Sequence, residues 1–130
     1  MRDWMTLYRN SGKRRGLCFA LSVEQFKELT SGDCYYCGEK PLHEYWARRR
    51  CEKTENAPYF CNGIDRKDSS IGYTIENCVS CCSPCNIAKM EQSEKDFIDR
   101  CRRVASHQES RELEQIIGLS DIESPDKAYI

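Results

Sequence analysis

The sequence contains no apolar run long enough to act as a secretory signal or to cross a membrane. Charged side chains interrupt residues 1–15, the segment in which a signal peptide would be expected. Without such a signal, disulfide bonds are not expected, although the 130-residue chain has ten cysteines. These absences predict a cytoplasmic protein with reduced thiols and no membrane partner.

Histidine is also scarce, since only His43 and His107 are present. Imidazole is the side chain that most readily exchanges a proton near neutral pH. Any reaction that needs an imidazole base must therefore use one of these two residues.

The chain has no large excess of either charge, because 20 Lys and Arg stand against 21 Asp and Glu. The charges are nevertheless unevenly distributed. Residues 1–108 carry 18 basic and 15 acidic side chains, for a net charge of +3, whereas residues 109–126 are acidic. Basic residues cluster at positions 9–15, 48–50 and 100–103. Such clusters either contact phosphate groups or form solvated surface, and the sequence leaves both interpretations open.

The cysteines have a spacing that is typical of a metal site. A single domain of this size has a marginal hydrophobic core unless a metal or cross-link stabilises it. Two Cys-x-x-Cys pairs, Cys34–Cys37 and Cys82–Cys85, could each direct two sulfurs toward one ion, as in structural zinc sites. Cys78–Cys81 forms an overlapping pair, so that spacing alone leaves two choices for the second half of the site.

Two helices are predicted before the first cysteine pair. Apolar residues at positions 1, 4, 5 and 8 have the spacing of an amphipathic helix that ends near Gly12. A second helix is predicted over residues 23–30, because Ser22 and Gln25 can form a capping box at its start. Residues 1–33 are therefore expected to be a helical and basic segment.

Residues 34–92 are predicted to form a small α+β core. Strands are expected at residues 62–67 and 77–82, joined by a loop with Gly72 as its turn residue. The dipeptide Ser83-Pro84 supplies an N-cap and a first-turn proline for a short helix.

Further helices are predicted after this core, in residues 93–118. One is expected to begin after Ser93 and to end near His107, and another to span residues 110–117 with Gly118 as its stop. The buried face of the first would consist of Phe97, Ile98, Cys101, Val104 and Ala105. Residues 119–130 are expected to be a loose tail that could dock on a protein partner or a second copy in a homodimer.

Several of these motifs occur in an order that resembles the HNH (ββα-metal) nucleases. The resemblance is to small phage and bacterial stand-alone members, and it extends from about residue 14 to residue 107. The matching motifs are Cys34-x-x-Cys37-Gly38, Asn62-Gly63-Ile64-Asp65-Arg66, Gly72-Tyr73-Thr74, Glu76-Asn77-Cys78, Cys82-x-x-Cys85-Asn86 and Ala88-Lys89.

The resemblance implies a ββα-metal finger stapled by a four-cysteine zinc site and flanked by helices. It favours Cys82–Cys85 over Cys78–Cys81, because Asn86 directly follows the former pair. Four protein ligands leave no open position, so this zinc would be structural. Catalysis would use a second ion, Mg²⁺ or Mn²⁺, held by Asp65 and Asn86, and Asn77 would hold the loop by hydrogen bonds.

The implied function is metal-dependent hydrolysis of phosphodiester bonds in duplex or branched DNA, in a phage or mobile element and in the cytoplasm of a bacterial or phage-infected cell. The substrate would be nicked or cut through both strands. Basic side chains expected to bind nucleic acid are Arg14, Arg15, Arg66, Lys67 and Lys89.

One residue departs from the family pattern. The family usually has its general-base histidine directly after the aspartate, whereas this chain has Arg66, which stays protonated and is a poor base. Arg66 would instead hold a phosphate. Three candidates for the base then remain. The first is a histidine, and the sequence favours His107 over His43. The second is Asp68, and the third is a metal-bound hydroxide. The alternative for His107 is an ordinary histidine near a helix end.

Two functions therefore remain open from the sequence. One is an active HNH endonuclease, and the other is a weak or inactive zinc-containing module that binds DNA or a protein partner. A second metal site formed by Cys51, Cys61, Cys78 or Cys81 is also left open, with free buried thiols as the alternative.

Overall fold

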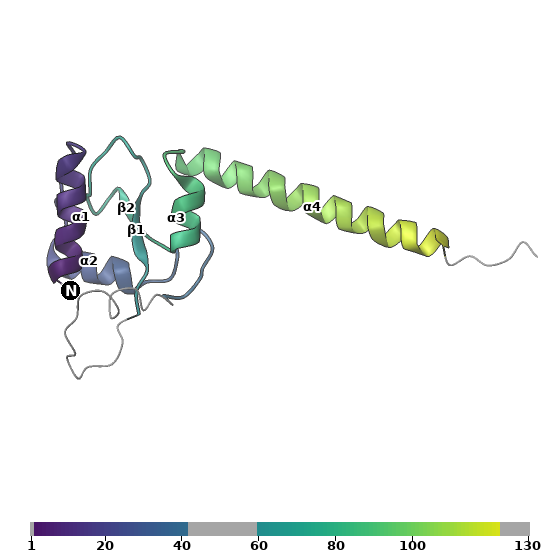
Figure 1. Cartoon of the computed structure of the whole chain (residues 1–130), viewed down its shortest axis with the longest axis horizontal. Coiled ribbons are helices and arrows are strands. Elements are labelled where there is room, and N and C mark those ends of the chain that lie inside the picture. The colour runs from purple at the N-terminus through teal and green to yellow at the C-terminus, as the bar shows by residue number, and fades with distance from the viewer. Residues whose placement is uncertain (1, 42–59, 123–130) are drawn as a thin grey trace, which may run out of the picture. The chain divides into compact units, whose positions relative to one another are not determined.

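The structure is a computed structural model that describes residues 2–41 and 60–122 (Figure 1). It divides into two compact units, Met1–Glu94 and Lys95–Ile130. The first unit contains the predicted finger, and the described part of the second is most of one long helix. No helix among the described residues has the length and apolar character needed to cross a membrane.

The two predicted N-terminal helices are present. Helix α1 spans Arg2–Arg14 and continues two residues past Gly12. Helix α2 spans Val23–Ser31 and begins with the predicted capping box, in which the Ser22 hydroxyl accepts from the Gln25 amide at 3.1 Å. The Ser22 amide in turn donates to Gln25 Oε1 at 2.9 Å, so both ends of the cap are satisfied.

A hairpin followed by a short helix forms the centre of the first unit. Strand β1 (Gly63–Arg66) pairs with antiparallel β2 (Cys78–Cys81), and the register places Asp65 opposite Val79. Helix α3 spans Ser83–Lys89. The predicted N-cap at Ser83 was wrong by one residue, because Cys82 takes the extended backbone of the cap and makes no side-chain cap bond.

The loop between the strands depends on Gly72 for a close contact and not for an unusual backbone angle. A Cβ at Gly72 would come within 2.5 Å of the Cys18 carbonyl oxygen, too close for any side chain. This contact lets the next residue, Tyr73, donate its amide to the Cys18 carbonyl at 2.9 Å. Phe19 forms an isolated parallel bridge with Tyr73.

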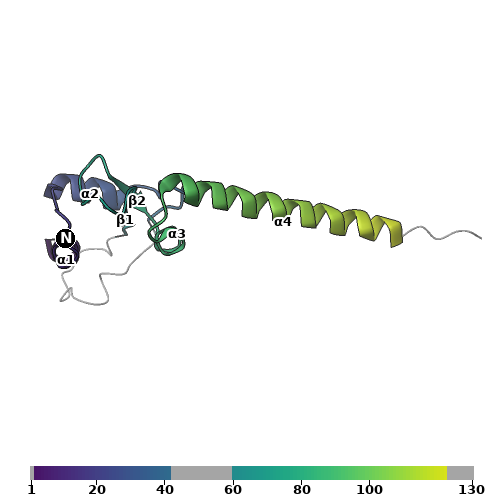
Figure 2. The same cartoon turned by 90° about the horizontal axis from the view of Figure 1, so that it is seen from above.

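The hairpin lies between α1 and α3, as both views show (Figures 1 and 2). Helix α2 packs on both strands and α3 packs on β1. Within the described part of the chain, this packing forms two clusters of buried side chains. The first contains Trp4, Met5, Leu21, Phe26, Cys61, Ile64, Tyr73 and Cys78. The second contains Cys34, Cys81 and Cys82, with Tyr36 and Cys85 packed against them.

Helix α4 runs without a break over Glu94–Ile122, so the predicted stop near His107 and the predicted stop at Gly118 were both wrong. Residues 106–112 contain neither proline nor glycine. Extending an existing helix through them is easier than nucleating a new one. The predicted buried face is also wrong beyond its first turns, because Phe97 is 5% exposed whereas Val104 is 57% exposed.

Candidate functional site

Four cysteine sulfurs converge beside the hairpin, and they belong to the two pairs that the family resemblance favours. Those of Cys34, Cys37, Cys82 and Cys85 all lie within 4.8 Å of one another, and we call them the four-cysteine group. The Cys37 and Cys82 sulfurs are 3.6 Å apart. Zn–S bonds of about 2.3 Å at tetrahedral angles would separate two sulfurs by roughly 3.8 Å. The donor set therefore fits a tetrahedral zinc ion with little movement.

The electrostatics of the four-cysteine group also suit a cation. Burial opposes the thiolate of Cys34, but hydrogen bonds from the amides of Cys82, Cys37 and Tyr36 outweigh it and lower its pKa to about 6. Burial and the neighbouring sulfurs raise the pKa of Cys85. A thiol with a raised pKa stays protonated in the absence of metal, but it loses its proton when a metal ion binds the sulfur.

The remaining described cysteines of the finger do not join this group. Cys61 and Cys78 lie in the first apolar cluster, where burial raises their pKa values to about 11 and about 12. Cys81 packs behind the four-cysteine group. Among the described residues no second metal-ligand cluster is found, whereas Cys51 and His43 lie outside them.

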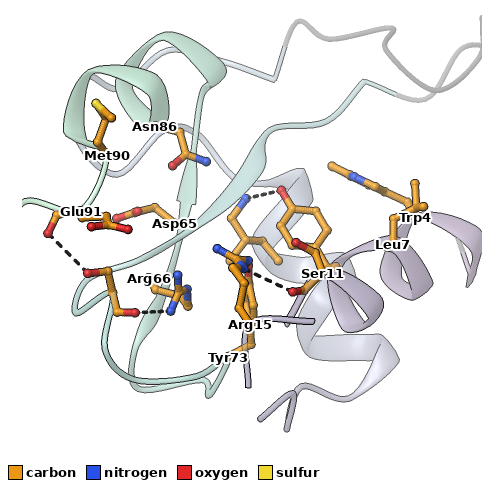
Figure 3. A pocket seen from close by; sticks show the side chains of 13 residues that line it. Trp4, Leu7, Ser11, Arg15, Asp65, Arg66, Tyr73, Asn86, Met90 and Glu91 are labelled. Atoms are coloured by element: carbon orange, nitrogen blue, oxygen red, sulfur yellow. Dashed lines mark hydrogen bonds between the residues drawn. The ribbon is translucent and has the colours of Figure 1, made fainter. Parts of the chain in front are cut away.

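A pocket of about 540 Å³ opens between α1, β1, α3 and the hairpin loop. Asp65, Asn86 and Glu91 lie on one side of it, and Trp4 and Ser11 lie on the other (Figure 3). The full lining consists of Trp4, Leu7, Tyr8, Ser11, Arg15, Ile64, Asp65, Arg66, Ser69, Tyr73, Asn86, Met90 and Glu91. The pocket thus unites Asp65 and Asn86, the two predicted ligands of a catalytic ion.

Asp65 is held by two partners that the sequence did not predict. Its side chain is only 5% exposed, and its Oδ2 accepts a hydrogen bond from the Tyr36 hydroxyl at 2.7 Å. The ammonium of Lys89 lies 3.2 Å from the same oxygen and 3.4 Å from Oδ1. The carboxylate therefore has a fixed orientation and a neutralising cation, and burial and the Asp65 carboxylate raise the pKa of Tyr36.

The ion pair between Asp65 and Lys89 corrects the prediction that Lys89 contacts nucleic acid. Lys89 is 0% exposed, and its ammonium also donates to the Arg66 carbonyl at 3.1 Å. A lysine is almost never buried completely unless it is paired, and Asp65 supplies the pairing charge. In this conformation the ammonium has no surface that a phosphate could reach.

Asn86 occupies the face of α3 that lines the pocket, and its side chain is half-buried. None of the described residues forms a hydrogen bond with its side-chain amide. Glu91, just beyond α3, places a further carboxylate at the same pocket. Carboxylate and amide oxygens are hard donors that suit Mg²⁺ or Mn²⁺. The chemistry of this wall therefore fits such an ion, although the Lys89 ammonium already neutralises Asp65.

Arg66 lies in the pocket wall, and its guanidinium already has hydrogen-bond and ring contacts within the protein. Its guanidinium donates to the carbonyls of Ser69 and Ile71, at 2.9 Å for the latter, and lies 5.2 Å from the centre of the Tyr73 ring. The Tyr73 hydroxyl accepts from Arg15 at 2.7 Å. Arg15 and Arg66 thus bring two guanidinium groups to one pocket.

Asn77 holds the hairpin loop from inside. Its Oδ1 accepts the Asp68 amide at 3.0 Å, and its Nδ2 donates to the carbonyls of Asp68 and Gly72 at 3.0 and 3.1 Å. Its side chain is buried, and it does not line the pocket. Asn77 therefore shapes the loop that carries Arg66's carbonyl acceptors.

The other predicted residues are not among those that line the pocket. Arg14 is exposed on the last turn of α1, and Lys67 is half-buried after β1. His107 is exposed on α4 in the second unit, next to Arg103 and Ser106. Asp68 is exposed, and hydrogen bonds from the Ser70 hydroxyl and amide lower its pKa, which makes it a poorer base.

The sequence analysis missed Tyr36, Glu91 and the α1 residues Trp4 and Ser11. Tyr36 lies inside the Cys-x-x-Cys turn, so its position was evident but the direction of its ring was not. Glu91 follows Asn86 by five residues and could have been considered from that spacing. The contribution of α1 depends on packing between distant segments, and no local pattern indicates it.

The hairpin, the following helix and the adjacent four-cysteine group define a small α+β protein with an HNH-type fold. The solved structure of the rare-cutting HNH restriction endonuclease PacI is similar to this chain, with a TM-score of 0.53 and 21% sequence identity. The match covers 83% of this chain and 78% of PacI. This similarity shows the fold.

The sequence itself is similar to an uncharacterised protein of Acanthamoeba polyphaga mimivirus, at 33% identity over 100 residues. That match covers 77% of this chain but only 16% of the viral protein. No protein-family model matches the sequence.

Proposed function

We propose that the protein is a metal-dependent HNH-type DNA endonuclease that hydrolyses phosphodiester bonds. One observation carries the proposal: Asp65 and Asn86, which come from β1 and α3, line one pocket beside a four-cysteine group that can hold the hairpin. A zinc-binding module with no catalytic role needs no carboxylate and amide in this arrangement. The fold of PacI, itself a DNA-cutting enzyme, supports the same function.

Two metal sites have different roles in this proposal. Zinc at the four-cysteine group would be structural, because four protein ligands leave no position for water. Asp65 and Asn86 would hold Mg²⁺ or Mn²⁺, an ion that stabilises negative charge on a phosphate and its leaving oxygen. The protein's own part is to fix the Asp65 carboxylate, present the Asn86 amide and place cationic side chains at the pocket.

Arg15 and Arg66 are the proposed phosphate contacts within the pocket, since both guanidinium groups line it. Arg14 and Lys67 are proposed to contact DNA outside it. Arg66 cannot accept the proton of an attacking water, and His107 stays the proposed base on the sequence argument. Nicking rates of His107→Ala, His43→Ala and Asp68→Ala would test this assignment, and full activity of His107→Ala would exclude it.

The biological setting proposed is a phage or mobile element, supported by similarity to a viral protein. A homodimer or a protein partner bound through the C-terminal segment is also proposed. Exposed apolar side chains on the second half of α4 support it, and they include Leu113, Ile116 and Ile117. Light scattering of the full chain at several concentrations tests the homodimer.

The alternative function is a catalytically weak or inactive module that binds DNA or a protein. The Asp65–Lys89 ion pair favours it, because an ammonium already occupies the space beside the carboxylate at 3.2 Å. Arg66 in the usual position of the base favours it as well. Both functions predict a bound structural metal, so cleavage is the property that separates them.

Nicking of supercoiled plasmid with Mg²⁺, Mn²⁺ or EDTA tests the proposal. The parent is expected to nick DNA only with a divalent ion, and Asp65→Ala and Asn86→Ala are expected to retain zinc and lose activity. Asp33→Ala is the matched control, since Asp33 is an exposed carboxylate that forms a surface ion pair with Lys40. Equal activity of the two pocket variants and the control would place the active site elsewhere, and no cleavage by the parent would favour the alternative.

A further inference from the structure

Tyr36 contacts both proposed metal sites, the four-cysteine group and the ion site at Asp65. It lies between Cys34 and Cys37, and its backbone amide hydrogen bonds to the Cys34 sulfur. Its ring packs against the buried cluster around the four-cysteine group. Its hydroxyl reaches Asp65 Oδ2 at 2.7 Å. The backbone of Tyr36 therefore belongs to the cysteine turn, while its side chain contacts the carboxylate proposed to bind the catalytic ion.

The second partner of Asp65 cannot replace this contact. The Lys89 ammonium lies at similar distances from both carboxylate oxygens, 3.4 Å from Oδ1 and 3.2 Å from Oδ2. It neutralises the carboxylate but scarcely distinguishes one oxygen from the other. Of the two carboxylate oxygens, Oδ2 is the one that accepts the hydrogen bond from the Tyr36 hydroxyl, so this hydroxyl fixes the rotation of the carboxylate.

We propose that Tyr36 is a positioning residue that transmits the order of the four-cysteine group to the Asp65 carboxylate. The inference rests on the proposed function, because it assigns Asp65 to an ion site. A metal at the four-cysteine group fixes the backbone of the cysteine turn, the turn fixes the ring of Tyr36, and the ring fixes Asp65. Outer partners of this kind typically change metal affinity by about 10–100-fold when they are removed.

The test compares two substitutions in the same cysteine turn. Tyr36→Phe removes the hydroxyl that contacts Asp65 and keeps the packed ring. Tyr35→Phe is the matched control, because its hydroxyl donates instead to Glu94 and its side chain is 54% exposed. Each full-length, zinc-loaded protein would be titrated with Mn²⁺ in the absence of DNA, and free Mn²⁺ would be measured by electron paramagnetic resonance. Zinc content and the thermal midpoint would be measured on the same samples.

The expected result is that Tyr36→Phe keeps one zinc per chain and binds Mn²⁺ about 10-fold or more weakly, while Tyr35→Phe binds Mn²⁺ like the parent. Equal or tighter Mn²⁺ binding by Tyr36→Phe would overturn the inference and leave the proposed ion site intact. Equal weakening in both variants, or loss of zinc from Tyr36→Phe, would also overturn it, because the hydroxyl would then act on the turn. A parent that binds no Mn²⁺ would refute the proposed function, and this inference with it.

Discussion

Replacing Lys89 with methionine tests the buried ion pair at the centre of the pocket. Methionine keeps most of the length and apolar stem of lysine and removes the ammonium, which pairs with Asp65 and donates to the Arg66 carbonyl. The side chains of Lys89 and Asp65 are 0% and 5% exposed, so water solvates the carboxylate that is left behind only poorly. Removing one partner of a buried pair costs about 3–5 kcal/mol in free energy of unfolding.

The hydroxyl of Tyr36 still donates to Asp65 in Lys89→Met, which places the expected loss near the lower limit, at about 3 kcal/mol. For a unit of this size that loss would lower the thermal midpoint by roughly 12 °C or more. Urea unfolding followed by circular dichroism in zinc-containing buffer measures it. Asp65→Asn and the double variant Asp65→Asn/Lys89→Met complete a mutant cycle, and the double variant should lose less than the sum of the single losses.

A surface ion pair provides the control for this cycle. Lys40 and Asp33 lie 3.5 Å apart, but their side chains are 78% and 55% exposed. Lys40→Met should leave the unfolding curve unchanged, because exposed pairs contribute little. Parent-like stability of Lys89→Met, or losses that simply add in the double variant, would show that Asp65 and Lys89 are not paired in solution.

Two further predictions concern the four-cysteine group and the packing of α1. Cys85→Ser should bind no zinc and be unfolded or insoluble, because small zinc domains depend on a metal binding energy on the order of 10 kcal/mol. A soluble variant with a parent-like urea midpoint would contradict this prediction. Burial raises the pKa of Tyr8 to about 12, so its contribution to stability is complete below its unfolded pKa of about 10 and is lost as pH rises toward 12. The stability difference between the parent and Tyr8→Phe should therefore fall over that range by about 1.4 kcal/mol per pH unit, and a difference independent of pH would refute the assignment.

The parts of the fold that could be predicted depend on residues close together in the sequence. The Ser22 capping box, the Cys-x-x-Cys turns and the strand, loop, strand, helix order each involve short spacings along the chain. Helix α4 was predicted less well, because its separation into two pieces rested on weak signals around His107 and on Gly118. One glycine in a long helix costs only about 1 kcal/mol and does not have to end it.

The positions of the candidate-site residues in the chain could be predicted, but the residues that contact them could not. Asp65 and Asn86 were identified from the order of motifs, and the fold does bring them to one pocket. Trp4 lines that pocket, and Tyr36 hydrogen bonds to Asp65, only through contacts between segments far apart in the sequence. Such contacts are determined by how α1 and the cysteine turn pack on the hairpin, which no local spacing specifies.

Lys89 shows why this distinction matters for function. Asn86 and Lys89 are three residues apart, so they share a face of α3, and that face packs toward β1. The sequence analysis assigned Asn86 to an ion and Lys89 to nucleic acid, and a lysine is buried completely only when it is paired. The pairing charge, Asp65, is 24 residues away and becomes available only when the hairpin and α3 have packed together. The packing that brings Asn86 close to Asp65 therefore also places the Lys89 ammonium beside the Asp65 carboxylate. A divalent ion bound by Asp65 and Asn86 must share this carboxylate with Lys89 or displace the ammonium.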